Sequence, residues 1–112
     1  MKIIKQGHGP VIELEEGTLK DLRSGKTYTF EGNKVLDEGG NVVYQFVRFS
    51  MLDAEGRLVL ERVNSTAFLI PGKGVVAETR GNSLYAYDGS VYDLEGLWFG
   101  PKIMAAVGLL FL

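Results

Sequence analysis

The feature that most constrains this chain is a turn that recurs along it. Three segments, 36–44, 52–60 and 87–92, lead from an apolar residue and an aspartate through glycine back into apolar sequence. Aspartate can accept a hydrogen bond from the backbone two residues on, and glycine adopts a positive φ without steric cost. Such turns between apolar runs are typical of β-hairpins. We therefore predict short antiparallel strands over most of the chain.

The segments between these turns have the hydropathy of strands. Residues 11–15 place Ile12 and Leu14 on one face and two glutamates on the other, as in a half-buried strand. Residues 42–49 and 67–70 are apolar on both faces, so we expect them in the middle of the structure or against a partner.

The length of 112 residues fits a single domain, 1–112, and 46% hydrophobic residues suffice for a core without disulfides. The turn spacing predicts a mostly β fold, a small antiparallel barrel or sandwich of about eight to ten short strands.

Two segments also allow a helix. Ser50 and Asp53 resemble a helix start, but Gly56 would then lie inside the helix at a cost of about 1 kcal/mol, so a hairpin is favoured. Near the C-terminus, Pro101 suits the first turn of a helix, while Gly108 would equally break a last strand. Both alternatives stay open for this segment.

The apolar C-terminal segment must be covered by the core or by a neighbouring subunit, because exposed it would promote aggregation. Self-association is therefore expected, which makes the protein a homo-oligomer. The candidate interface residues are Ile103, Leu109, Leu110 and Phe111.

The run of Asp…Gly-Asn hairpins followed by an apolar C-terminal segment resembles tubby-like and LURP-one-like barrels, in which a hydrophobic helix threads the barrel. Those domains are considerably longer than this chain, and short Asp-Gly hairpins occur in many unrelated β-proteins. No motif is specific enough for a functional residue to be carried over, so the chain is not assigned to either family.

The residues that a zinc site or a phosphate-binding loop requires are absent from the chain. The chain has no cysteine and a single histidine, His8, whereas a zinc site needs three or four ligands of these types. Gly25-Lys26-Thr27 resembles the end of a phosphate-binding loop, but position 20 is lysine where that loop needs glycine. We therefore predict no metal and no cofactor.

Carboxylates are the remaining catalytic option. Pairs such as Asp37 with Glu38 and Asp53 with Glu55 stand close in sequence, but most of these acids lie in the turns themselves. A carboxylate-dependent enzyme is thus kept as an alternative, and a protein without catalytic activity is favoured.

The best candidate for a binding surface is a cluster of aromatic residues between positions 85 and 99. It comprises Tyr85, Tyr87, Tyr92, Trp98 and Phe99. If exposed, these rings would form a recognition patch; if buried, they would be core. Acidic neighbours and a net charge of -2 argue against nucleic acid.

The leading functional hypothesis is a non-catalytic binding or assembly module that self-associates. The alternative is a barrel that binds a small molecule or carbohydrate at an aromatic-lined mouth, where a carboxylate could act. Residues 103–112 form the longest apolar stretch, too short to span a membrane, and the N-terminus lacks the apolar run of a signal peptide. We expect a complete, cytoplasmic protein that does not bind membranes.

Overall fold

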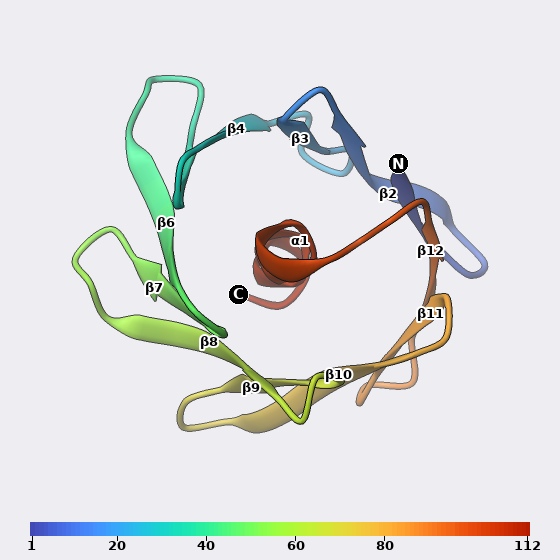
Figure 1. Ribbon diagram of the computed structural model, residues 1–112. Helices are drawn as coiled ribbons and strands as arrows, with labels where there is room; N and C mark the ends of the chain where they lie inside the picture. Colours follow the sequence, from blue (N-terminus) through green and yellow to red (C-terminus); the bar gives the residue numbers. More distant parts are fainter.

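The computed structural model describes residues 1–112 as twelve strands and one helix. The strands are β1 (Lys2–Lys5), β2 (Gly9–Glu15), β3 (Thr18–Asp21), β4 (Thr27–Glu31), β5 (Lys34–Leu36), β6 (Val42–Val47), β7 (Ser50–Asp53), β8 (Leu58–Val63), β9 (Ala67–Ile70), β10 (Gly74–Arg80), β11 (Ser83–Ala86) and β12 (Val91–Glu95). The helix is α1 (Gly100–Phe111). All strands pair antiparallel with their sequence neighbours, and β12 closes onto β1 (Figure 1).

The predicted mostly β fold is confirmed as a closed barrel, with more strands than the eight to ten expected. Strands such as β5, with three residues, are too short to show alternating hydropathy. The segment at Ser50 is strand β7 of a hairpin, as favoured.

An inward-facing residue recurs in every second strand at a nearly constant spacing. It occupies positions 3, 19, 35, 51, 68 and 84, which are 16 or 17 residues apart, and every member is fully buried. Each is in register with inward residues on both neighbouring strands, as Met51 is with Phe46 and Leu60. The barrel is therefore a tandem of six two-strand units. We call these six residues the belt; they are Ile3, Leu19, Val35, Met51, Phe68 and Leu84.

The helix α1 lies in the middle of the ring of strands (Figure 1). A barrel of twelve strands is wider than its own side chains can fill, so a further element must occupy the lumen. Residues 103–107 are buried there. The C-terminal segment is thus a helix rather than a last strand.

The close fit of α1 depends on Gly108. A Cβ atom at this position would lie 2.6 Å from the Met51 Cε atom and 3.2 Å from the Tyr44 ring. The helix therefore approaches the barrel wall at a residue without a side chain.

Strand directions define two ends of the barrel. The helix-entry end carries the segment 96–99 that leads into α1, together with the turns β2–β3, β4–β5, β6–β7, β8–β9 and β10–β11. The opposite, helix-exit end carries the remaining turns, including those that contain Asp37, Asp53 and Asp88.

The strands expected to be buried on both faces differ from that expectation. In a closed barrel every strand has one face toward the lumen and one toward solvent. In β6, Phe46 is buried whereas Val47 is exposed, and in β9 Phe68 is buried while Leu69 is only partly covered. Outward apolar residues are therefore partly solvated and are not evidence of a central position in a sheet. No helix of this protein is long and apolar enough to cross a membrane.

Candidate functional site

The carboxylates of the recurring turns have structural roles. Asp37 and Asp53 each accept hydrogen bonds from the backbone amides two and four residues on, at 3.0 and 2.9 Å, and Asp88 accepts one from Ser90 at 2.8 Å. These backbone bonds lower the pKa of all three aspartates. A general acid needs a raised pKa, whereas these turns stabilise the ionised carboxylate. No three His, Asp or Glu side chains gather as metal ligands would.

The aromatic residues singled out in the sequence do not form one surface. Tyr92 and Trp98 are buried, and the Trp98 indole N–H donates to backbone carbonyls at 3.1 and 3.2 Å. Tyr85 lies on the outer wall, where the Arg80 guanidinium is 4.9 Å from its ring centre. Tyr87 is exposed at the helix-exit end and Phe99 at the helix-entry end. Of these residues, Phe99 lines one of the hollows described below.

The residues proposed for an oligomer interface belong to α1. Ile103 is fully buried inside the barrel, and Leu109, Leu110 and Phe111 are partly buried against the core. The Phe111 ring also meets Tyr92 edge-on, with centroids 6.1 Å apart. The barrel itself thus covers much of the apolar surface for which a second subunit was invoked.

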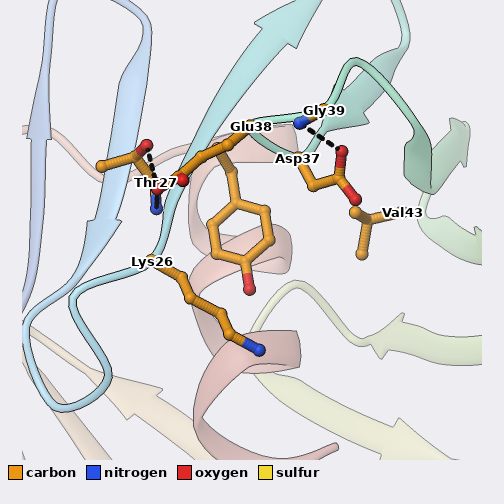
Figure 2. Close-up of a pocket in the computed structure, with 7 residues that line it drawn as sticks. Lys26, Thr27, Asp37, Glu38, Gly39 and Val43 are labelled. Carbon is orange, nitrogen blue, oxygen red and sulfur yellow. Dashed lines mark hydrogen bonds between the residues drawn. The ribbon is translucent and has the colours of Figure 1, made fainter.

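A first hollow, of about 300 Å³, opens at the helix-exit end (Figure 2). The Glu38 carboxylate accepts hydrogen bonds from the Thr27 amide and hydroxyl at 3.0 and 2.9 Å, and these lower the pKa of Glu38. Figure 2 shows Glu38 reaching Thr27 and Asp37 bonded to Gly39. Both acids at this hollow are therefore engaged in the fold. Its lining comprises Lys26, Thr27, Tyr28, Asp37, Glu38, Gly39 and Val43.

A second hollow, of about 360 Å³, lies at the helix-entry end, between the start of α1 and the turns after β6 and β8. We call it the entry hollow; it is lined by Phe49, Arg62, Ser65, Phe99, Gly100 and Met104. The Phe49 and Phe99 side chains are 70% and 67% exposed. Exposed large apolar side chains that line one hollow are typical of a binding site.

Arg62 is the only charged residue of the entry hollow. It occupies an inward position of β8, in register with Phe68, and its guanidinium lies 5.1 Å from the centre of the Phe68 ring. The Nε–H group is buried without a hydrogen-bond partner, and Arg62 forms no ion pair. An unsatisfied buried donor costs about 1–3 kcal/mol. Burial also lowers the pKa of Arg62, because desolvation disfavours the cation.

The backbone holds this arrangement together. The Arg62 amide donates to the Phe49 carbonyl at 2.8 Å, which fixes the β6–β7 turn beside β8. Ser65 has a positive φ of 61°, a conformation that side chains other than glycine rarely adopt. The first turn of α1 contains no acidic residue and its N-cap, Phe99, makes no side-chain hydrogen bond, so the positive end of the helix dipole is uncompensated.

Sequence reasoning singled out Phe99 but missed Arg62 and Phe49. The available signal was the spacing of the repeat, since Phe30, Phe46 and Arg62 follow one another at intervals of 16. An arginine in a series of inward phenylalanines is visible once these segments are aligned. Comparisons with protein-family models, curated proteins and solved structures found no match to this chain.

Proposed function

We propose that this protein is a non-catalytic binding module whose entry hollow holds a small molecule with a flat apolar body. The observation that carries the proposal is that two exposed rings, Phe49 and Phe99, line a hollow that also contains an arginine without an ion-pair partner. Covering two phenylalanines with a ligand removes apolar surface from water at about 25 cal/mol per Å².

The size of the hollow limits the ligand. About 360 Å³ is near the lower end of the usual range for small-molecule sites, roughly 300–1,000 Å³. Met104, a buried residue of α1, also lines the hollow. Methionine adapts to irregular shapes and contacts aromatic rings favourably, which suits a planar ligand.

Binding is favoured over catalysis because of how the carboxylates are used. No aspartate or glutamate lines the entry hollow. The acids at the opposite hollow, Asp37 and Glu38, are engaged by backbone and hydroxyl donors that stabilise their charged forms.

Self-association is the other part of the hypothesis, and a second copy would compete for the same end of the barrel. A two-fold contact through this end would bring two Arg62 side chains together, and like charges at an interface are unfavourable. We therefore favour a small molecule as the occupant. A mass measurement by light scattering across a range of protein concentrations tests the competing proposal, in which the mass would exceed 12.3 kDa and Phe49→Ala would return it to that value. The cytoplasmic location stays a prediction.

The proposal is tested with 3-phenylpropanol and 3-phenylpropanoate, which carry one flat ring. Two-dimensional NMR should show shifts for the amides of Phe49, Ser65 and Gly100, with saturation in the millimolar range. Phe49→Ala and Phe99→Ala should each weaken binding several-fold. The matched control is Tyr87→Ala, which removes a ring of similar exposure at the other end and should leave binding unchanged. Shifts confined to the helix-exit end, or none with either compound, would overturn the proposal.

A further inference from the structure

We infer that the ligand of the entry hollow carries a single carboxylate, and that Arg62 pairs with it while the ligand's apolar body lies between Phe49 and Phe99. This inference rests on the proposed binding function and adds the charge that the ligand must bear.

The Arg62 guanidinium has no hydrogen-bond acceptor or ion-pair partner within the protein. Arg62 lies against the Phe68 ring at 5.1 Å, its Nε–H is buried without a partner, and none of the ion pairs in the protein involves it. Guanidinium groups bind carboxylates through two parallel N–H···O bonds, and these are stronger away from water. The two Nη groups of Arg62 are not among the buried atoms and make no hydrogen bond within the protein, so a carboxylate in the entry hollow would supply their acceptors.

The six repeated units of the barrel show that a charge at the position of Arg62 is exceptional. Each belt residue has an inward register partner on the even-numbered strand that comes before it in the ring. This partner is apolar in four of the six units. In a fifth unit it is Thr79, whose hydroxyl donates to the Thr66 carbonyl at 3.4 Å. Only Arg62 introduces a charge there, and the apolar equivalents show that the barrel closes without one. The four apolar residues are Leu14, Phe30, Phe46 and Leu94.

The charge of the residues around Arg62 also favours a carboxylate. The other lining residues carry no charge, so nothing in the hollow repels an anion and no second cation calls for a doubly charged group. A monoanion therefore matches the site better than a phosphate monoester does. The Ser65 hydroxyl and the uncapped start of α1 add donors of the same polarity.

The test compares three compounds that share one body: 3-phenylpropanoate, 3-phenylpropanol and 3-phenylpropylamine. We expect the carboxylate to bind at least tenfold more tightly than the alcohol and the amine to bind most weakly, as measured by NMR titration of the full chain. In Arg62→Met, which keeps an apolar stem, the preference for carboxylate over alcohol should fall below twofold while the alcohol still binds.

The outcomes separate this inference from the proposed function. Equal binding of carboxylate and alcohol to the unmodified protein, or tighter binding of the amine, would overturn the inference and leave the binding site standing. Absence of binding by all three compounds would overturn the proposed function itself. An unchanged preference in Arg62→Met would also contradict the role of Arg62, and because the comparison in the unmodified protein needs no variant, a folding defect in Arg62→Met would not obscure the result.

Discussion

At the scale of single residues, the turn aspartates and Arg62 differ in whether the fold satisfies their charged groups. At the helix-exit end, Asp37, Asp53 and Asp88 are each bonded to their own turn. At the helix-entry end, Arg62 is partly desolvated and unpaired. The hydrogen-bonding capacity of the turn aspartates is used within the fold, whereas Arg62 keeps a donor group that no acceptor of the protein meets.

This contrast predicts that Arg62 costs stability. Arg62→Phe restores the residue found one and two units earlier and removes a buried donor without a partner, so the free energy of unfolding should rise by about 1 kcal/mol. Urea denaturation measures the change. The control is Arg57→Phe, whose guanidinium is bonded to Asp53 at 2.8 Å and lies in solvent. A loss of several kcal/mol on Arg62→Phe would mean that Arg62 is structural.

The lowered pKa values of the turn aspartates predict that the stability of the protein falls in acid. Backbone hydrogen bonds set the pKa of Asp37, Asp53 and Asp88 below the unfolded value, which is about 4. Their contribution to stability is therefore present above pH 4 and is lost as the pH falls through the lower folded-state values. Replacing all three by asparagine should flatten the decline in unfolding free energy below pH 4. Glu95→Gln serves as the control, and an unaltered decline in the triple variant would contradict the prediction.

The raised pKa of Tyr44 predicts that the protein loses stability at high pH. Burial raises the pKa of Tyr44 to about 12, above the usual value of 10.0. The unfolded chain releases this proton first, so stability should fall as the pH rises from about 10 to 12. Tyr44→Phe should remove part of that fall in denaturation experiments, whereas Tyr87→Phe, on an exposed ring, should not. An equal effect of both substitutions would speak against the burial of Tyr44 as the cause.

At the scale of elements, the packing of α1 against β6 and β7 depends on Gly108. Alanine is favoured over glycine in helices by about 1 kcal/mol, yet here its Cβ would meet the Met51 Cε atom at 2.6 Å and the Tyr44 ring at 3.2 Å. The Met51 Cε atom is the end of a flexible side chain, but Met51 is fully buried and must repack, so we expect Gly108→Ala to lower the free energy of unfolding by about 1 kcal/mol.

A double-mutant cycle isolates that contact. In a Met51→Ala background the methionine terminus is gone, so the added cost of Gly108→Ala should be smaller than in the unmodified protein. Thermal or urea denaturation of the four proteins gives the coupling energy. Additive effects would show that Gly108 is needed for a reason other than its approach to Met51.

At the scale of the whole molecule, barrel and helix depend on each other. The lumen is filled by residues 103–107 of α1, and the belt residues pack around them. A chain that ends at Phe99 would leave the lumen open to water. We expect such a truncated chain to lose its cooperative unfolding transition, and a peptide of residues 100–112 added in trans to restore it. A truncated barrel that unfolds cooperatively by itself would contradict this dependence.

Local sequence determined the turns, because an aspartate that bonds its own backbone and a glycine at positive φ act within a few residues. For the same reason the hairpins around Asp37, Asp53 and Asp88 were predictable, and so was the mostly β class. The belt residues can also be found in the sequence, but only by aligning segments that are 16 or 17 residues apart.

Three features were decided only by the tertiary structure. Residues 100–111 suit either helix or strand locally, and the width of a twelve-strand barrel selects the helix that fills it. Tyr92 and Trp98 are buried while Tyr87 and Phe99 are exposed, because closure of the ring determines which face of each strand meets the lumen. The entry hollow joins Phe49, Arg62 and Phe99 from three distant segments, and no local rule can bring such residues together.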